Sequence, residues 1–161
     1  MLTAADKGKI PSAKGHRFAI VASEYNARYV DSMLDAATRV LEQAGADVVI
    51  CVRVPGAYEI PVVTASLARA AKTRFSAIIC LGVILRGATT HAQHIGEAVS
   101  QALAEIQVRD LVPVIHEVLL LENEEQAAAR CLNAENNRGL EAARTAVKMA
   151  AIMAHLKKIP A

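Results

Sequence analysis

The sequence predicts a single α/β domain folded as a three-layer α/β/α sandwich, in which a four-stranded parallel sheet lies between two layers of helices. Four apolar, strand-like segments alternate with helical patterns along the chain. Alternation of this kind with short connections is typical of parallel sheets covered on both faces. The chain has 161 residues, of which 53% are hydrophobic, and this suits one sizeable core rather than two domains.

The four predicted strands are rich in Ile, Val and Leu, as expected for strands that are buried on both faces. They cover residues 17–22, 47–54, 77–85 and 112–121. Of the three cysteines, Cys51 and Cys80 fall within these segments, and no two cysteines have the spacing of a disulfide framework or a zinc site. We therefore expect small, buried thiols in a reducing compartment, the cytoplasm.

The first two helices follow from apolar spacing and from start and stop signals. Apolar residues recur at helical spacing over residues 30–41, and Gly45 supplies a stop. After the second strand, Pro61 is tolerated only in the first turn of a helix, so this helix is expected to begin near Ile60. We expect it to continue to Lys72.

The last three helices are predicted in the same way. The third presents one apolar face over residues 95–106. The fourth is expected to be capped by Asn123, with Gln126 as the return partner, and to end near Cys131. The fifth is expected over residues 137–156.

Residues 1–16 are predicted to form a flexible, mildly basic amino-terminal arm, and residues 17–161 the single domain. The net charge is only +2, with the two signs interspersed, so nothing indicates binding to nucleic acid. No apolar run has the length needed to span a bilayer, and no apolar segment follows the basic amino end as in a secretory signal. We therefore expect neither a nucleic acid nor a membrane partner.

Polar and charged residues follow the third predicted strand, where the sequence over residues 86–91 is Arg-Gly-Ala-Thr-Thr-His. The carboxyl edge of a parallel sheet is where ligands bind. Thr90 and Gln93 fit a capping box, and the helix start that they define is suited to an anion such as phosphate. Imidazole is the usual proton carrier in enzymes near neutral pH, so His91, which lies beside that site, is the candidate proton carrier. The alternative is an ordinary solvent-exposed histidine.

A metal site is a second alternative for this helix, because His91, His94 and Glu97 lie close together along it. The pattern lacks the two histidines four residues apart with an intervening Glu that hydrolytic zinc helices use, and no cysteine is near. We expect no metal and no cofactor. A metal-dependent hydrolase is nevertheless kept as a competing function.

Two further loops and one helix add candidates at the same edge. Residues 54–61 (Val-Pro-Gly-Ala-Tyr-Glu-Ile-Pro) form a loop that two prolines stiffen, suited to binding a planar heterocycle through its backbone, with Glu59 as an acceptor. Tyr25 follows the first strand and is able to stack on a flat ring. The Arg130 guanidinium fits a phosphate. The alternative roles are a rigid turn for residues 54–61, cover for the end of the core for Tyr25, and a solvated surface position for Arg130.

These segments resemble the lumazine synthase family. Three motifs carry the likeness: residues 54–61, residues 82–91 (Gly-Val-Ile-Leu-Arg-Gly-Ala-Thr-Thr-His), and residues 122–130, which run from Glu-Asn to Arg. Their order, spacing and strand-to-helix context match over about residues 17–156. The resemblance implies a flavodoxin-like fold and a cofactor-free transferase of riboflavin biosynthesis. In that family, 5-amino-6-(D-ribitylamino)uracil condenses with 3,4-dihydroxy-2-butanone 4-phosphate to give 6,7-dimethyl-8-ribityllumazine, phosphate and water.

The resemblance also implies a role for each candidate residue. Proton transfer falls to His91. The residues implied for the pyrimidine and its ribityl chain are Tyr25, Ala57, Tyr58, Glu59, Val83, Ile84, Leu85 and His116. The residues implied for the ketone phosphate are Ala88, Thr89 and Arg130.

In the lumazine synthase family the pocket lies between adjacent subunits of a pentamer, and the neighbour supplies Arg130 and the fourth-strand region. The resemblance therefore implies a homo-oligomer. Pentamers, decamers and icosahedral capsids all remain open, although the uninterrupted connection over residues 133–139 favours the capsid.

The sequence departs from the family pattern at a few positions. Tyr25 stands where Phe is usual, and Arg138 replaces a Lys. At the end of the fourth strand, His116 and Glu117 replace an aromatic and a small residue. These last two leave open a competing function, a flavin-binding or shell-forming protein without turnover.

Overall fold

The computed structural model describes residues 9–160, so residues 1–8 of the expected arm lie outside the described residues. The strands are β1 (Arg17–Ser23), β2 (Val48–Val54), β3 (Ala77–Leu85) and β4 (Val114–Leu121). The helices are α1 (Ala27–Gln43), the 3-10 turn η1 (Ala57–Glu59), α2 (Ile60–Ala68), α3 (His91–Asp110), α4 (Glu124–Cys131) and α5 (Arg138–Leu156).

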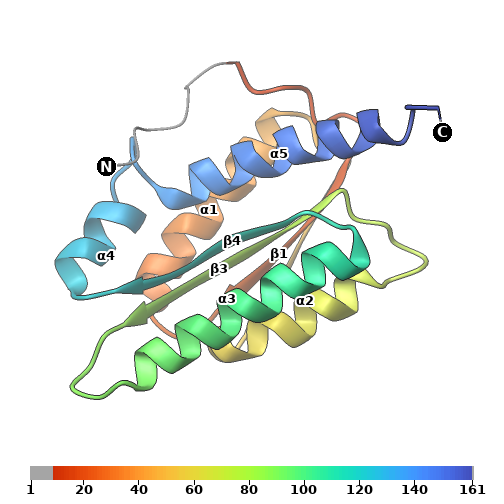
Figure 1. Ribbon diagram of the computed structural model, residues 1–161. Coiled ribbons are helices and arrows are strands. Elements are labelled where there is room, and N and C mark those ends of the chain that lie inside the picture. Colours follow the sequence, from red (N-terminus) through yellow and green to blue (C-terminus); the bar gives the residue numbers. More distant parts are fainter. Residues whose placement is uncertain (1–8, 161) are drawn as a thin grey trace.

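The predicted three-layer α/β/α sandwich is confirmed. Helices α1, α4 and α5 cover one face of the sheet, and α2 and α3 cover the other (Figure 1). All strand pairs are parallel, and the strand order is β2-β1-β3-β4. This order is typical of flavodoxin-like folds, in which the chain changes direction across the sheet between β1 and β3. A crevice at the carboxyl ends of the strands is expected at that point.

The central strands are buried on both faces, as their continuous apolar sequence predicts. In β1, Phe18 and Ile20 pack toward α1 and α5, whereas Ala19 and Val21 pack toward the layer of α2 and α3. All four residues are fully buried. The alternation follows from the two-residue period of a strand, and each face therefore requires its own cover of helices.

Two predicted boundaries are wrong. Helix α2 ends at Ala68 rather than at Lys72, because the following residues are mostly polar and bring no apolar face to pack. Strand β4 begins at Val114 rather than at Val112. Pro113 has no N–H to donate to the neighbouring strand, although its carbonyl oxygen accepts from Ile78 N at 2.9 Å.

The cysteines divide between the core and an edge. Cys80 and Cys131 are buried, as expected for Cys80, but Cys51 is exposed. The prediction was wrong for Cys51 because β2 is an edge strand of the sheet. Burial raises the pKa of the Cys80 thiol to about 12, which keeps this side chain neutral and unreactive.

Part of the segment before β1 packs against the rest of the domain. Ala13 is fully buried, and its N–H donates to the carbonyl oxygen of Ala44 at 2.8 Å. Gly15 N donates to Asp47 Oδ1 at 2.8 Å. Among residues 9–160, no helix combines the length and hydropathy that crossing a membrane requires.

Helices α1 and α5 are in close backbone contact at Gly139. A Cβ at this position would overlap the backbone carbonyl of Met33 on α1. The contact is held by Asn137, whose side chain accepts from Gly139 N at 2.8 Å and donates to Ser32 Oγ at 3.1 Å. The start of α5 is therefore locked onto α1 by backbone proximity rather than by bulky side chains.

We predict that Gly139→Ala destabilises the fold by about 3 kcal/mol or more, because the overlap with Met33 is with backbone and no rotamer relieves it. The matched control is Gly96→Ala, a half-buried position of α3 where a Cβ meets the Leu120 side chain at an ordinary 3.5 Å. This control is expected to leave stability unchanged or to raise it by about 0.5–1 kcal/mol through helix propensity. Urea unfolding of both variants measures the difference, and equal midpoints would contradict the close packing of α1 on α5.

Candidate active site

Three loops meet at the carboxyl edge of the sheet, where the strand order predicts a crevice. The loop after β1 is bonded to the loop after β2, because Glu24 N donates to Val54 O at 2.7 Å and Tyr25 N donates to Pro55 O at 3.1 Å. It is also bonded to β3, since Asn26 Nδ2 donates to Val83 O at 2.7 Å. These contacts hold three segments of distant sequence in one fixed arrangement.

The loops enclose a pocket of about 980 Å³, which we call the carboxyl-edge pocket. Its size is at the upper end of the range for small-molecule sites. It contains nine of the twelve predicted site residues: Tyr25, Ala57, Tyr58, Glu59, Val83, Ile84, Leu85, Thr89 and His91. The three predicted loops thus converge on one pocket within a single chain.

Sequence reasoning gave Asn26 no role, although it lines this pocket. Its backbone is left-handed, with φ of 58°, and it precedes α1. Asn is among the few residues that adopt this conformation readily. That preference, next to a predicted strand end, was the available signal. The hydrogen bond to Val83 gives Asn26 the role of fixing the pocket wall.

The predicted capping box at the start of α3 is wrong. Thr90 already has helical backbone angles, with φ of −75° and ψ of 0°, and its side chain caps nothing. Gln93 Nε2 instead donates to Glu97 Oε1 at 2.8 Å, while Thr89 Oγ1 accepts from His91 N at 3.4 Å. A capping residue needs an extended backbone to turn its oxygen toward the helix, and Thr90 lacks it.

The first turn of α3 therefore keeps free donors. Within the described residues, the N–H groups of Ala92 and Gln93 have no acceptor. They lie at the positive end of the helix dipole, where an anion is stabilised. Gly87 and Thr89 line the pocket just before this turn. The anion site that the sequence predicts keeps its donors, although the predicted cap is absent.

His91 lies in the first turn of α3, and His94, Ile95 and Ala98 line the pocket one and two turns later. Their spacing of three, four and seven residues is that of a single helix face, and helical periodicity would have identified it. In the described part of the chain, no group of three or more His, Cys, Asp or Glu side chains is arranged to hold a metal ion.

Two exposed tyrosines flank the pocket. Tyr25 is 74% exposed and Tyr58 is 64% exposed, although the chain has only three Tyr, two Phe and no Trp. Large exposed aromatics at a pocket rim mark a surface that binds a ligand or another protein surface.

Three predicted site residues do not line the carboxyl-edge pocket within one chain: Ala88, His116 and Arg130. Ala88 lies between two residues that do. Arg130 is exposed in the last turn of α4, and His116 lies on β4. Arg86, the first residue of the 86–91 motif, pairs with Glu122 at 3.0 Å and does not line the pocket.

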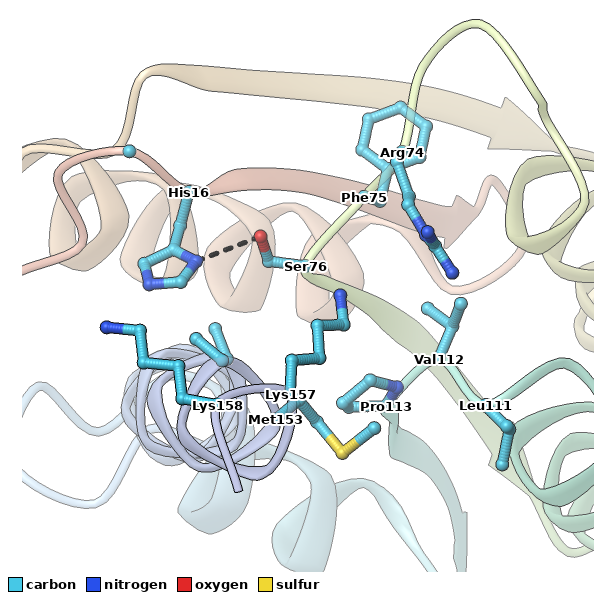
Figure 2. A pocket seen from close by; sticks show the side chains of 13 residues that line it. His16, Arg74, Phe75, Ser76, Leu111, Val112, Pro113, Met153, Lys157 and Lys158 are labelled. Carbon is cyan, nitrogen blue, oxygen red and sulfur yellow. Dashed lines mark hydrogen bonds between the residues drawn. The ribbon is translucent and has the colours of Figure 1, made fainter. Parts of the chain in front are cut away.

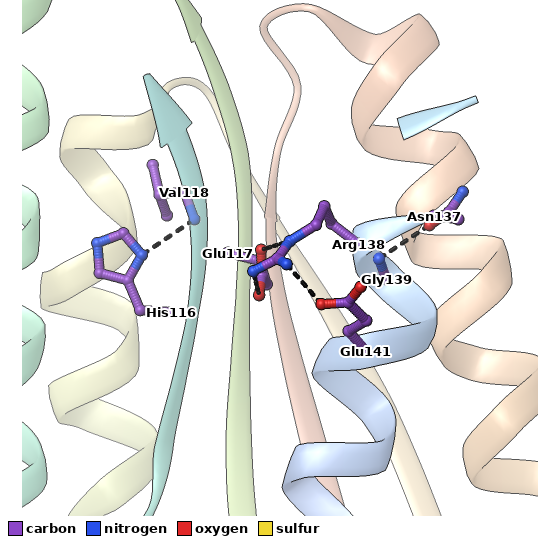
Figure 3. Close-up of polar contacts among 7 residues, drawn as sticks. All are labelled: His116, Glu117, Val118, Asn137, Arg138, Gly139 and Glu141. Atoms are coloured by element: carbon purple, nitrogen blue, oxygen red, sulfur yellow. Dashed lines mark hydrogen bonds and ion pairs between the residues drawn. The ribbon is translucent and has the colours of Figure 1, made fainter. Parts of the chain in front are cut away.

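His116 faces the α3 side of β4 (Figure 3). Its Nδ1 accepts from Val118 N at 3.3 Å, so Nε2 carries the proton and donates to Ser100 Oγ at 2.8 Å. Ser100 Oγ in turn donates to Gly96 O at 2.7 Å. Partial burial lowers the pKa of His116, which favours the neutral ring in this tautomer.

Glu117 faces the opposite side of β4 and meets the start of α5 (Figure 3). Arg138 donates to it twice, from Nε at 3.0 Å and from the second terminal nitrogen at 2.8 Å. The same guanidinium also pairs with Glu141. Burial raises the pKa of the Glu117 carboxyl, against the hydrogen bonds and charge of Arg138, which lower it.

The Arg138 guanidinium is firmly charged. Burial lowers its pKa, but the hydrogen bonds and charges of Glu117 and Glu141 outweigh burial and raise it overall. Arg130 is close enough for its charge to lower the pKa of Glu117 as well. One arginine is therefore held by two carboxylates, while Arg130 forms no ion pair with any residue that the structure describes.

Comparison with known proteins gives consistent matches over almost the whole chain. The sequence model of the family described as 6,7-dimethyl-8-ribityllumazine synthase matches residues 15–154. A protein of that name from Xylella fastidiosa is 38% identical over 148 residues, which cover 91% of this chain and 93% of the relative. One from Desulfotalea psychrophila is 40% identical over 141 residues (86% and 89%), and one from Clostridium kluyveri is 35% identical over 153 residues (94% and 97%).

We predict that breaking the buried pair costs stability. Glu117→Ala is expected to cost about 3 kcal/mol, because it removes a forked ion pair and leaves Arg138 half-compensated. The double variant Glu117→Leu with Arg138→Met is expected to lose less unfolding free energy than Glu117→Leu and Arg138→Met lose together as single variants, by about 1–3 kcal/mol. Urea unfolding measures all of these values.

The control for this cycle is the exposed pair of Asp31 and Arg53, whose side chains are 53% and 30% exposed. Asp31→Ala is expected to cost less than about 1 kcal/mol. Strictly additive losses at Glu117 and Arg138 would contradict the coupling.

Proposed function

The chain belongs to the 6,7-dimethyl-8-ribityllumazine synthase family, and from this we infer that it is a transferase of riboflavin biosynthesis. The enzyme condenses 5-amino-6-(D-ribitylamino)uracil with 3,4-dihydroxy-2-butanone 4-phosphate. The product is 6,7-dimethyl-8-ribityllumazine, and phosphate and water are released. We place this reaction in the cytoplasm and assign it to one domain, residues 17–161, which is supported by the family match over residues 15–154.

The observation that carries the assignment of the site is the convergence of the family motifs on the carboxyl-edge pocket. Residues 57–59 of the η1 turn, residues 83–85 at the end of β3, and Thr89 and His91 at the start of α3 line one cavity. In our proposal, Tyr25 stacks on the pyrimidine, and the η1 turn and the end of β3 bind its ring and ribityl chain.

The rigidity of the η1 turn supports this role. Gly56 has an extended backbone, with φ of −138°, a conformation that other residues also adopt. A Cβ at Gly56 would lie 2.9 Å from Glu59 Oε2. The Glu59 carboxylate therefore folds over Gly56 at the pocket wall, where it is placed to accept from ligand N–H or O–H groups.

His91 is proposed as the proton carrier. Imine formation, elimination of phosphate and ring closure each require proton transfers, and none requires a nucleophile from the protein. The imidazole lies in the pocket wall beside the free N–H groups of the α3 start. Positioning of two substrates supplies a further part of the rate, about 7–11 kcal/mol in favourable cases.

The ketone phosphate is proposed to bind where α3 begins. Ala88 and Thr89 precede the free N–H groups of Ala92 and Gln93, and this polar turn favours the phosphate dianion. Arg130 is proposed to complete the site from a neighbouring subunit, because it does not line the pocket of its own chain.

We propose a homo-oligomer built from pentamers, with an active site between adjacent subunits and closure into an icosahedral capsid. In a pentameric ring, head-to-tail contacts between neighbouring subunits would cover exposed apolar side chains. Tyr25 and Tyr58 lie beside the pocket, and Val62 and Val108 lie farther along the layer of α2 and α3. His116 on β4 would then face the pyrimidine of the neighbour. Sedimentation velocity distinguishes pentamer, decamer and capsid.

We predict that His91→Ala lowers kcat for lumazine formation by about 100-fold, since general acid–base groups contribute about 10²–10⁴ to rate. The matched control is His94→Ala, one turn along the same pocket wall, for which a much smaller loss is expected. The readout is absorbance of the product in the steady state. Equal losses in the two variants would remove His91 as the proton carrier.

We predict that Arg130→Ala raises KM for the ketone phosphate about 10- to 100-fold, which corresponds to the loss of a charge-assisted hydrogen bond. KM for the pyrimidine is expected to change little. A rise in the KM of the pyrimidine alone would contradict the phosphate assignment.

Mixing these two variants tests whether the site is shared. If His91 and Arg130 come from different subunits, unfolding and refolding an equal mixture of His91→Ala and Arg130→Ala chains restores about one quarter of the sites. If both residues serve the same chain's site, no intact site forms and no activity returns.

A further inference from the structure

A second hollow lies at the opposite edge of the sheet and has no part in the proposed reaction (Figure 2). Its volume is about 380 Å³, and we call it the amino-edge pocket. His16, Ser76 and Pro113 line it, each directly before a strand, and so does the end of α5. The nine residues of β3 separate it from the carboxyl-edge pocket by about 30 Å.

The charges around the amino-edge pocket have one sign. Arg74, Lys157 and Lys158 line it together with His16, and no carboxylate among the described residues does so. None of the three permanent cations forms an ion pair within the described part of the chain. In a chain whose net charge is only +2, three unpaired cations at one hollow are a local excess that an anion would relieve.

The helix dipole explains only part of this cluster. Lys157 and Lys158 follow the carboxyl end of α5, where cations are favoured by about 0.3–1 kcal/mol. Arg74 belongs to the connection between α2 and β3 and lies outside the last turn of α5. In Figure 2 its guanidinium and the Lys157 ammonium approach the pocket from different elements.

His16 adds a directed donor. Ser76 Oγ accepts from Arg17 N at 3.4 Å and lies 3.0 Å from His16 Nδ1, to which its hydroxyl can donate. With Nδ1 accepting, a neutral His16 carries its proton on Nε2. This N–H has no acceptor among the described residues, and in Figure 2 the nitrogen faces the end of α5.

The remaining wall of the pocket is apolar. Phe75, Val112 and Pro113 are buried and form the floor of the pocket, whereas Leu111, which is 72% exposed, and the half-buried Met153 present apolar surface to it. A bare inorganic ion leaves such a wall unused, whereas a ligand with a small apolar body covers it.

We propose that the amino-edge pocket binds a phosphate monoester with a small apolar body. A phosphate monoester carries about −1.5 to −2 charge near pH 7, which matches three cations better than a single carboxylate does. The Arg74 fork and the two ammonium groups bind the phosphate oxygens, His16 Nε2 donates the fourth contact, and Leu111 and Met153 cover the body. The proposal does not depend on the activity assigned to the other pocket.

Phenyl phosphate is the probe, titrated calorimetrically in low-salt buffer free of phosphate into the full chain carrying Arg130→Ala. This background removes binding through the arginine assigned to the ketone phosphate. One saturable site per chain is expected. Inorganic phosphate and benzoate are expected to bind about tenfold more weakly, and neutral benzyl alcohol not at all.

Substitutions localise the site. Arg74→Ala and Lys158→Ala are each expected to weaken phenyl phosphate binding about tenfold, and both residues are exposed, so the fold is retained. The matched control is Lys148→Ala, an exposed lysine of α5 that does not line the pocket, for which an unchanged affinity is expected. Absence of saturable binding, affinity unchanged by Arg74→Ala, or equally tight benzoate binding would each overturn the proposal.

Discussion

The whole arrangement depends on two strands, β1 and β3, that are buried on both faces. Alternate side chains of β1, such as Phe18 and Ala19, enter different cores. Both cores therefore need helices, and the chain must cross from one face to the other as it adds strands to each side of β1. The reversal of direction between β1 and β3 leaves a crevice at their carboxyl ends. The loops that line the candidate active site follow these parallel strands, so they lie at this same edge.

Strand β4 separates two departures from the family pattern that are adjacent in sequence. Because neighbouring side chains of a strand point to opposite faces, His116 meets Ser100 on α3 and Glu117 meets Arg138 on α5. The Glu117 carboxylate is therefore paired with Arg138 inside the protein, on the face of β4 opposite to His116. This geometry also engages Arg138, whereas Arg130 forms no ion pair with any described residue.

The two edges of the sheet have different electrostatic origins. At the carboxyl edge, favourable sites for anions come from the backbone: the first turn of α3 keeps N–H groups that no side chain caps. At the amino edge they come from side chains, namely Arg74 and the lysines after α5. Backbone donors are rigid and suit a reaction that requires precise positioning, whereas long side chains suit reversible binding.

The sequence by itself determined the four strands, the five helices, the parallel sandwich and the three motifs that identify the family. These features are encoded by residues close to one another in the chain, through apolar periodicity and through turn residues such as Pro61 and Gly45. Most of the candidate site was predictable for the same reason, since loops that follow parallel strands lie at one edge.

The tertiary structure alone decided which distant residues bond to one another within the chain. The bond of Asn26 to Val83 spans 57 residues and the pair of Glu117 with Arg138 spans 21, and the place of each depends on strand register and on which face a residue takes. The state of the Thr90 cap, the end of α2 and the exposure of Cys51 likewise depended on backbone angles and packing. Local sequence specifies a tendency, but a hydrogen bond or a buried surface exists only when a distant segment arrives at the matching position.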